Sequence, residues 1–190
     1  GSRGIGKAIA RTLAEEGVSI VIASRGKKAL ESTAEELSLE TGSNVTGVVA
    51  DTGSDDSVQN LIGEAKNILS GVDILVNSAA RPGGQSAVPT LSEITTDEFN
   101  DHMNVKVMGY LRCAREVAPL MAEQRWGRII NISGMASRNS GTVVGSMRNV
   151  AVTAMTKNLA DELGPLGINV TVVHPGMTRT EATEGVIARR

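Results

Sequence analysis

The sequence contains little of what marks several specialised classes of protein. Aromatic residues make up 2% of it. Cys113 is its one cysteine, so an internal disulfide framework is excluded. A reducing, cytoplasmic compartment is therefore expected. No apolar run reaches the about 18 residues that a membrane-spanning helix needs, so no membrane partner is expected. The 19 basic and 21 acidic residues give a formal net charge of −2, which argues against a nucleic-acid partner.

The composition is that of a globular domain. The chain has 190 residues, of which 41% are hydrophobic, and it contains 21 glycines. At this length a single domain over residues 1–190 is the first expectation. Because the chain starts with Gly1 inside a glycine-rich turn, and not with Met, we expect it to be a fragment of a longer protein.

Short apolar runs alternate along the chain with helical stripes. The runs rich in Val and Ile have the usual length of a strand and occupy residues 18–23, 45–50, 72–77, 128–132 and 168–173. Between them, apolar residues recur at the spacings of three and four that are typical of amphipathic helices. Thr95 and Glu98 predict a capping box at the start of one long helix. The alternation predicts an α/β fold with a doubly wound parallel sheet and helices on both faces.

The start of the chain carries the first functional signal, because ligands bind at the carboxyl ends of the strands in such sheets. Residues 1–6 read GSRGIG and lead straight into a helical stripe. The spacing resembles the tail of T-G-x-x-x-G-x-G, the cofactor turn of the short-chain dehydrogenase/reductase family. A pyrophosphate would meet this turn at Ser2, Arg3, Gly4, Ile5 and Gly6. A capped surface turn is the alternative interpretation of such a glycine cluster.

The resemblance to this family extends from residue 1 to about residue 181. It implies a Rossmann-like fold, a nicotinamide dinucleotide cofactor, and hydride transfer to or from a small carbonyl or alcohol compound. It also implies that the first, central strand and the last strand of the sheet lie outside this chain. Two unpaired strand edges would remain, so we expect the chain by itself to be aggregation-prone or partly folded. Since family members often form dimers or tetramers, the full-length protein is expected to be a homo-oligomer.

Two arginines bear on the choice of cofactor. Arg25 comes roughly twenty residues after the glycines, where an acid would bind an adenosine 2′-hydroxyl and an arginine accommodates a 2′-phosphate. Arg25 and Arg3 could grip that phosphate through charge-assisted hydrogen bonds. The family uses the same two positions to select NADP(H), which is therefore the expected cofactor; no metal is expected. The alternative is that Arg25 is a solvated loop charge.

Two further strand ends resemble cofactor-binding motifs of the family. Asp51 and Thr52 follow the run at 45–50, where the family places an acid against the adenine. Capping of the next helix is another role open to Asp51. Residues 73–80 read DILVNSAA and look like the family's D-I-L-V-N-N-A-G, in which the first asparagine is largely structural. This likeness assigns cofactor contacts to Asn77, Ser78 and Ala79.

The segment after the last apolar run is similar to a third family motif. Residues 174–180 read HPGMTRT and match P-G-x-x-x-T, whose Pro-Gly bends the chain around the nicotinamide. The likeness assigns cofactor contacts to Pro175, Gly176, Thr178 and Thr180. In the family, the threonine matched by Thr180 bonds the carboxamide. A generic Pro-Gly turn is the alternative.

The residues that transfer protons in the family are not all present. Asn104 matches the active-site asparagine, and Ser133 is the hydroxyl nearest to the family's serine, whose own position falls on Gly134. In the family's Tyr-x-x-x-Lys pair, the tyrosine transfers the proton while the lysine lowers its pKa and binds the ribose. These two positions fall on Gly145 and Asn149. Asn149 can still bond a ribose hydroxyl, but it brings no charge.

Other residues offer alternatives for the missing proton donor. Tyr110, the one tyrosine, lies in another helix and is interpreted as a packed residue. His174, Ser146 and Arg148 lie near a strand end or the changed positions, and each is more simply an ordinary loop or helix residue. Three hypotheses stay open: a short-chain oxidoreductase with an atypical active site, a nucleotide-binding pseudoenzyme or partner subunit, and a nonfunctional partial product.

Overall fold

The structure is a computed structural model that describes residues 1–81 and 88–181. In chain order its main elements are α1 (Gly4–Glu15), β1 (Ile20–Ser24), α2 (Lys27–Thr41), β2 (Val45–Val49), α3 (Asp55–Leu69), β3 (Ile74–Asn77), α4 (Thr96–His102), α5 (Gly109–Glu123), β4 (Gly127–Ile132), α6 (Val143–Leu163) and β5 (Ile168–Val173). Each strand matches one of the predicted apolar runs to within two residues at either end, so the predicted alternation of strands and helices is confirmed.

The strands form two parallel sheets. β1 pairs with β2, starting from Ile20 opposite Val45, and β3, β4 and β5 form the second sheet with β4 in its centre. Within the described residues, β1 and β3 are not hydrogen-bonded to each other. The expected α/β architecture is therefore present, with its sheet divided between β1 and β3.

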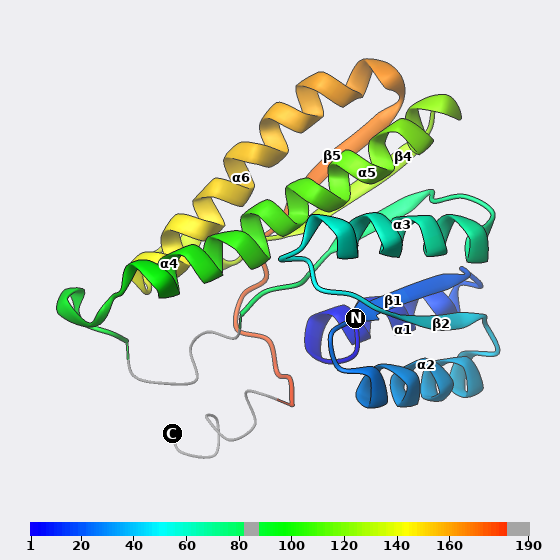
Figure 1. Cartoon of the computed structure of the whole chain (residues 1–190), viewed down its shortest axis with the longest axis horizontal. Helices are drawn as coiled ribbons and strands as arrows, with labels where there is room; N and C mark the ends of the chain where they lie inside the picture. Colours follow the sequence, from blue (N-terminus) through cyan, green and yellow to red (C-terminus); the bar gives the residue numbers. More distant parts are fainter. Residues whose placement is uncertain (82–87, 182–190) are drawn as a thin grey trace.

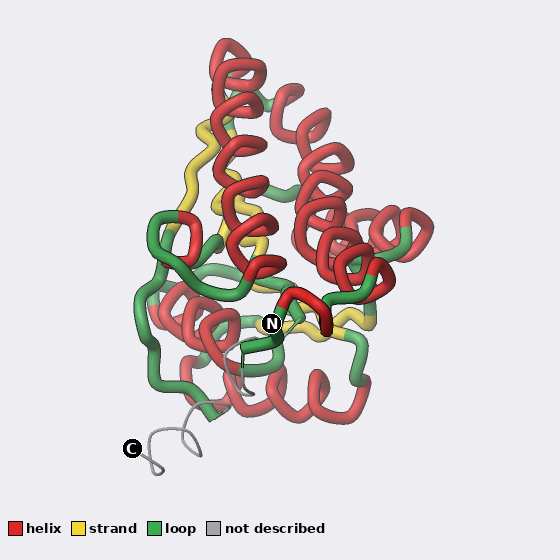
Figure 2. The backbone as a smooth tube through the Cα atoms, turned by 90° about the vertical axis from the view of Figure 1, so that its left-hand side faces the viewer, coloured by secondary structure: helices red, strands yellow, loops and turns green. Residues whose placement is uncertain are grey.

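Helices cover both faces of these sheets. α1 and α2 pack together against one side of β1 and β2, whereas α3, α5 and α6 form a layer on the other side (Figure 1). The two layers of helices also stand out in Figure 2, where the N terminus lies near the centre of the view. This is the doubly wound arrangement that strand–helix alternation predicts.

Two apolar clusters hold the elements together. The larger one joins α3, α5 and the second sheet, and Val58, Val117, Met121 and Ile129 are fully buried in it. The smaller one lies between α1, α2 and β1 around Leu30 and Leu37. The clusters fix the sheet layers, so the carboxyl ends of the strands are presented by a packed scaffold.

The helix that leads into α5 differs from the prediction. Thr95 does cap α4, since its Oγ1 accepts a hydrogen bond from the Glu98 amide at 3.1 Å. The reciprocal capping box, however, lies one turn earlier, where Thr90 N donates to Glu93 Oε2 at 2.7 Å. A π-helix, η2 (Met103–Met108), then joins α4 to α5. Single π-turns inside α-helices are frequent at functional sites, and Asn104 lies in this one.

Candidate functional site

The glycine-rich turn lies directly beside the carboxyl end of β1. Gly1 N donates to Ala23 O at 2.7 Å, and Thr33 Oγ1 of α2 donates to Ser2 O at 3.1 Å. A Cβ on Gly6 would come within 2.7 Å of Ser78 Oγ, so the glycine allows α1 to approach the segment after β3. The start of α1 is thus brought against the ends of two strands, where backbone amides and the helix dipole favour an anion.

The end of β1 has features that fit a phosphate-bearing group. Arg3 and Arg25 are exposed, and neither forms a salt bridge within the described part of the chain. Ser24 Oγ is buried and has no hydrogen-bond partner there, which is unusual for a buried polar atom. Sequence reasoning did not select Ser24; the only signal for it was its position just before Arg25. These residues could together hold a phosphate-bearing group.

The turn after β2 is held by Asp51. Asp51 Oδ1 accepts a hydrogen bond from Gly53 N at 2.9 Å, and Ser57 Oγ accepts one from Asp51 N at 2.9 Å. The N-cap of α3 is Ser54, whose Oγ accepts from the Ser57 amide at 3.3 Å. Asp51 therefore closes the turn before the helix, and the alternative role of helix cap belongs to Ser54.

This turn is bonded to the π-helix that carries Asn104. Thr52 Oγ1 donates to Val105 O at 3.1 Å, and Asn104 Nδ2 donates to Gly53 O at 3.1 Å. Arg112, which is also paired with Asp55, donates through Nη1 to Thr52 O and to Asn104 O. The side chain and the carbonyl of Asn104 are thus both used to bind the π-helix to the turn after β2.

The asparagine at the end of β3 has a structural role. Asn77 is 5% exposed and its Nδ2 donates to Asn131 Oδ1 on β4 at 2.9 Å. Asn131 in turn donates to Thr156 Oγ1 on α6 at 3.0 Å. These hydrogen bonds link β3 and β4 to α6. Ser78, which follows Asn77, is the residue of this segment whose hydroxyl faces Gly6.

Tyr110 is a packed residue. It is 1% exposed, and its hydroxyl donates to Ile132 O at 3.0 Å. Burial raises the pKa of the phenol far above its usual range. A phenol that is buried, bonded to the backbone and hard to ionise cannot act as the site's proton donor.

The positions matched in the sequence to the family's serine and Tyr-x-x-x-Lys pair are closely packed. Ser133 is 6% exposed and its hydroxyl donates to Asn149 O at 3.0 Å. A Cβ on Gly134 would lie 3.0 Å from Asn149 Nδ2, so the Asn149 amide lies against Gly134. A Cβ on Gly145 would collide with the hydroxyl of Thr142, the N-cap of α6.

A lysine that sequence reasoning missed lies at the centre of this group. Lys106 is 4% exposed; its Nζ donates to Asn149 Oδ1 at 2.8 Å and to Ser133 O at 3.1 Å. Burial, and then the charge of Arg148, lower the pKa of Lys106 from 10.5 to about 7. The sequence held a signal: Lys106 is four residues before Tyr110, on the face of the helix that enters the core.

Arg148 is a second buried cation beside it. Arg148 is 8% exposed; its Nη1 donates to Arg81 O at 3.1 Å and lies 2.7 Å from His102 Nδ1. A guanidinium only donates hydrogen bonds, so His102 accepts here and is uncharged. Burial, followed by the charge of Arg148, lowers the pKa of His102. Arg148 Nε is buried without a partner among the described residues.

The segment after β5 crosses to the start of α1. A Cβ on Gly4 would lie 3.7 Å from Thr180 Cγ2, and Gly4 N donates to Glu181 Oε2 at 3.0 Å. Within the segment, Thr178 Oγ1 donates to Gly176 O at 3.2 Å. The structure thus brings the residues assigned to the nicotinamide end, which begin at Pro175, to the same place as the glycine turn. Glu181 is a residue that the sequence did not single out.

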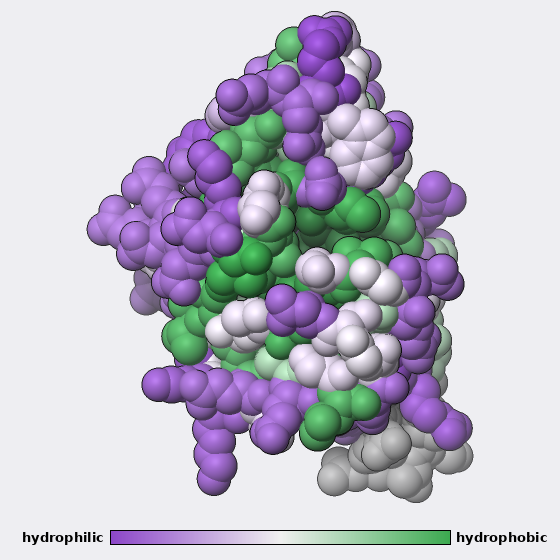
Figure 3. Space-filling view, turned by 90° about the vertical axis from the view of Figure 1, so that its right-hand side faces the viewer, coloured by the Kyte–Doolittle hydropathy of each residue, from purple (hydrophilic) through white to green (hydrophobic). Residues whose placement is uncertain are grey.

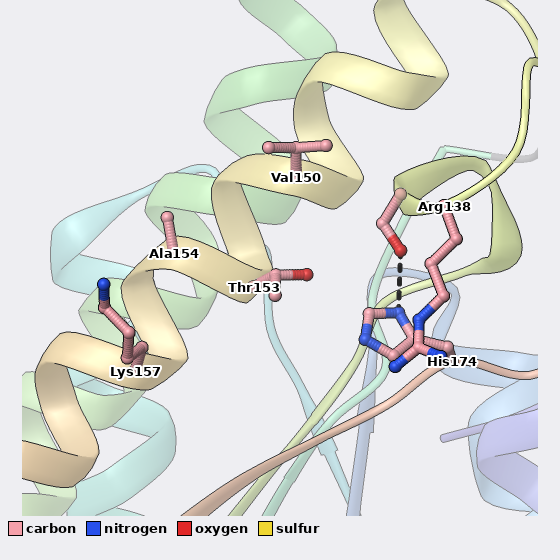
Figure 4. Close-up of a pocket in the computed structure, with 7 residues that line it drawn as sticks. Arg138, Val150, Thr153, Ala154, Lys157 and His174 are labelled. Atoms are coloured by element: carbon pink, nitrogen blue, oxygen red, sulfur yellow. Dashed lines mark hydrogen bonds between the residues drawn. The ribbon is translucent and has the colours of Figure 1, made fainter.

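His174 lies beside the segment that follows β4, with its Nδ1 3.4 Å from Gly134 O. Its Nδ1 lies 2.9 Å from Ser137 Oγ, and both line a cavity of about 320 Å³ with Val150, Thr153 and Lys157 of α6 (Figure 4). Thr153 follows Asn149 by one helical turn, and its Oγ1 donates to Asn149 O at 3.0 Å. Ser146 is half-buried near the start of α6 and forms no side-chain hydrogen bond within residues 1–81 and 88–181. His174, through Gly134, thus lies next to the group formed by Ser133, Asn149 and Lys106.

Residues 1–81 and 88–181 contain neither a membrane-spanning helix nor a cluster of metal-binding side chains. No helix in that part of the chain is both long and apolar enough to cross a membrane. No group of three or more metal-binding side chains was found in the same part. Cys113 is buried in α5, and burial raises the pKa of its thiol to about 11, which leaves it in the unreactive thiol form.

Known proteins resemble this chain along most of its length. The family model described as short chain dehydrogenase matches residues 1–190. An uncharacterised oxidoreductase of Staphylococcus aureus (strain USA300) is 36% identical over 183 residues, which are 95% of this chain and 76% of that protein.

Two solved structures with bound cofactors share the fold. An actinorhodin polyketide ketoreductase with NADPH has a TM-score of 0.91 and 30% identity, over 99% of this chain and 72% of that one. An NAD⁺-bound xylitol dehydrogenase has a TM-score of 0.83 and 28% identity, over 93% of this chain and 66% of that one. The chain thus spans two thirds to three quarters of the proteins it resembles, and it belongs to the short-chain dehydrogenase/reductase family, whose oxidoreductases use NAD(P).

Proposed function

We propose that this chain is part of an NADP(H)-dependent oxidoreductase that transfers hydride between the nicotinamide and a small carbonyl or alcohol compound, with an atypical active site. The observation that carries the proposal is the meeting of three segments at the start of α1. These are the glycine turn, the end of β3 at Ser78, and the segment that runs from Pro175 to Thr180. Each supplies residues of the kind that a dinucleotide requires.

The preference for NADP(H) is supported by the charges at the end of β1. Arg3 and Arg25 are exposed and without salt bridges in the described chain, and Ser24 Oγ is a buried hydroxyl in need of a partner there. No acid stands next to Ser24 to bind a 2′-hydroxyl or to repel a 2′-phosphate. The related structures hold both NAD⁺ and NADPH, so the proposal rests on these residues.

The rest of the cofactor would follow the edge formed by the strand ends. Ser2, Gly4, Ile5 and Gly6 would hold the pyrophosphate at the start of α1. The adenine would lie near the turn formed by Asp51 and Thr52. The nicotinamide and its ribose would contact residues from three segments, namely Ser78, Ala79, Asn149, Pro175, Gly176, Thr178 and Thr180. When bound, NADP(H) supplies the hydride or accepts it.

Within residues 1–81 and 88–181, no tyrosine is positioned to donate the proton of the reaction. Gly145 has no side chain, the Ser133 hydroxyl is bonded to Asn149 O, and the Tyr110 hydroxyl is bonded to Ile132 O. Because a positioned acid or base contributes about 10²–10⁴-fold, we expect carbonyl reduction to be slow. The same observation favours a second candidate function, a nucleotide-binding pseudoenzyme or partner subunit that keeps the cofactor site without turnover.

One experiment separates the two candidates. The protein is incubated with NADPH and a panel of ketones, aldehydes and ketoacids, and the oxidation of NADPH is followed by its absorbance; binding is measured on the same sample by calorimetry. Slow oxidation that depends on the carbonyl compound supports the oxidoreductase. Tight binding with no oxidation supports the pseudoenzyme, and no binding contradicts both.

A further inference from the structure

Lys106 is buried where no opposite charge in the described part of the chain compensates for the free energy of removing its ammonium group from water. Its Nζ bonds two neutral oxygens, Ser133 O and Asn149 Oδ1, and no carboxylate in residues 1–81 and 88–181 forms a salt bridge with it. The charged neighbour that acts on it is Arg148 of α6, which repels it. The Tyr110 ring lies 5.9 Å from Nζ and offers a weak cation–π contact. A methionine would fill the same volume without the cost of burying a charge.

The lysine determines how the Asn149 amide is oriented. An ammonium group has only donors, so it is the oxygen of the Asn149 amide that faces Lys106. The nitrogen, Nδ2, must then face away from it, and it lies 3.0 Å from the point where Gly134 would carry a Cβ. No acceptor within the described residues takes a hydrogen bond from this Nδ2. The amide is therefore held with two unused donors beside the segment that follows β4.

We propose that Lys106 is the positioning residue of this site: from the π-helix it supplies the positive charge that is absent at position 149, and it holds the Asn149 amide so that Nδ2 donates to a hydroxyl of the nicotinamide ribose. The inference rests on the proposed function, because that hydroxyl belongs to the cofactor. It assigns to Lys106 a role that its place in the sequence does not suggest. It also explains why residue 134 is glycine, since a larger side chain would displace the amide.

The proposal makes NADPH affinity depend on pH through Lys106. The groups that face its ammonium are Arg148 from α6, the Tyr110 ring from α5, and the neutral oxygens of Ser133 and Asn149. With a pKa of about 7, Lys106 loses its charge as the pH rises through neutrality. Affinity should therefore fall between about pH 6 and about pH 9, because the charged form polarises the amide and attracts the phosphates.

Calorimetric titration of four proteins with NADPH tests this. The wild type should lose affinity as the pH rises. Lys106→Gln should bind about tenfold more weakly at pH 6, the cost of one charge-assisted hydrogen bond, and Lys106→Arg should keep its affinity across the range. Lys157→Gln, which removes an exposed lysine of α6, is the matched control and should behave as the wild type does. Equal affinity and equal pH profiles for Lys106→Gln and the wild type would overturn the inference.

An exchange variant tests the positional part of the argument. Lys106→Asn alone should weaken NADPH binding, and Asn149→Lys alone should lower the thermal midpoint because it brings two ammonium groups together. Lys106→Asn combined with Asn149→Lys moves the charge to the other helix and should recover most of the affinity. If the exchange binds no better than Lys106→Asn, the charge does not act through this pair and the inference is wrong.

A readout without cofactor separates this inference from the proposed function. The ¹³Cε resonances of the lysines are followed during a pH titration of the free protein, and Lys106 is assigned with Lys106→Arg. One lysine should titrate near pH 7, and Asn149→Asp should raise that pKa by supplying a counter-charge. A Lys106 that titrates near 10.5 overturns the inference even if NADPH binds. Failure of NADPH to bind the wild type contradicts the proposed function and, with it, the cofactor contact of Asn149.

Discussion

Single residues near the end of β4 give this site its electrostatic character. Lys106 and Arg148 are both more than nine-tenths buried, and no acid within the described chain pairs with either. Glycines stand at 134 and 145, where side chains would meet Asn149 and Thr142. The site therefore combines buried positive charge with an absence of bulky or acidic side chains, which suits an anionic cofactor better than it suits proton transfer.

The buried lysine predicts how stability changes with pH. The pKa of Lys106 is lowered to about 7 in the folded chain, so between about pH 7 and pH 10 the unfolded chain binds more protons, and stability rises with pH. Lys106→Met should lack this rise. Urea unfolding should show the wild type gaining about 2 kcal/mol relative to Lys106→Met between pH 7 and pH 9. Parallel pH profiles for the two proteins would show that Lys106 is not a buried ammonium.

The packing around Gly145 and Asn149 predicts how much turnover is gained when the family's Tyr-x-x-x-Lys pair is introduced at these positions. Gly145→Tyr with Asn149→Lys places a side chain against Thr142 and a second ammonium against Lys106. The double variant should therefore gain little turnover. Adding Thr142→Gly and Lys106→Ser removes both conflicts and should raise NADPH-dependent carbonyl reduction by about 10²-fold.

Carbonyl-dependent NADPH oxidation by the two variants and the wild type is the measurement. Equal rates in the double and quadruple variants would show that Thr142 and Lys106 do not oppose the change. High turnover in the unmodified protein would contradict the expectation of a missing proton donor, and His174→Ala would then test the remaining candidate.

The residues of the glycine turn and of the turn after β2 could be singled out from the sequence because their spacing is local. Asp51 closes its turn through the next few residues, whereas the contact of Gly6 with Ser78 depends on a distant segment that no local pattern records. Ser24, Lys106 and Glu181 were missed because each depends on what another segment brings to it. The contact between Lys106 and Asn149 spans 43 positions in the chain, and no local pattern records it.

Whole segments, rather than side chains alone, assemble the cofactor edge. The segment after β5 returns to α1, where Gly4 N donates to Glu181 Oε2 at 3.0 Å. A carboxylate therefore takes one of the first free amides of α1, the kind of group that would bind a pyrophosphate. The segment after β5 and a bound cofactor would therefore compete for the backbone amides at the start of α1.

Removing that competition should tighten cofactor binding. Glu181→Gln keeps the size of the side chain and removes its charge, so the amide of Gly4 is released more easily and repulsion of the phosphates is lost. We expect NADPH to bind about twofold to fivefold more tightly, in line with the energy of a charge at a helix end. Fluorescence titration measures this, with Glu15→Gln at the other end of α1 as the control. If Glu181→Gln binds NADPH with the same affinity as the wild type, the hydrogen bond between Glu181 and the Gly4 amide does not oppose cofactor binding.

Regular elements were predictable where packing repeats along the chain. Runs of Val and Ile on both faces marked the strands, such as Ile168–Val173, because buried parallel strands need apolar residues at nearly every position. The π-helix Met103–Met108 was not predicted, because one extra residue in a turn hardly alters the apolar spacing. Thr95 caps α4 as predicted, but the reciprocal capping box forms at Thr90; the sequence did not separate the two because each threonine is followed by a glutamate three residues on.

At the scale of the whole molecule, the main feature is that the described strands form two sheets, with no hydrogen bonds between β1 and β3. β1 and β3 each keep one edge that is not paired within the described residues, and the two sheets are joined through packing of α3. Hydrophobic residues are also exposed across the middle of one face (Figure 3). Surfaces of this kind mark interfaces or aggregation-prone regions.

The two sheets should open independently. β4 has a partner on both sides and lies in the larger cluster, whereas β1 has one partner and lies mainly in the smaller cluster. Amides of β1 and β2 should therefore exchange with deuterium at least about tenfold faster than those of β4, since local opening reflects local packing. Mass-spectrometric hydrogen exchange measures this. Uniform protection across both sheets would show that they unfold as one unit.

The central claim is that this chain carries an NADP(H) site built around Arg3 and Arg25. Its most direct test is calorimetric titration of the protein, and of its Arg25→Asp variant, with NADPH and NADH. The wild type should bind NADPH at least about tenfold more tightly than NADH, because the arginines form charge-assisted bonds with the 2′-phosphate, and Arg25→Asp should reverse the order. Equal or tighter binding of NADH by the wild type would contradict the account.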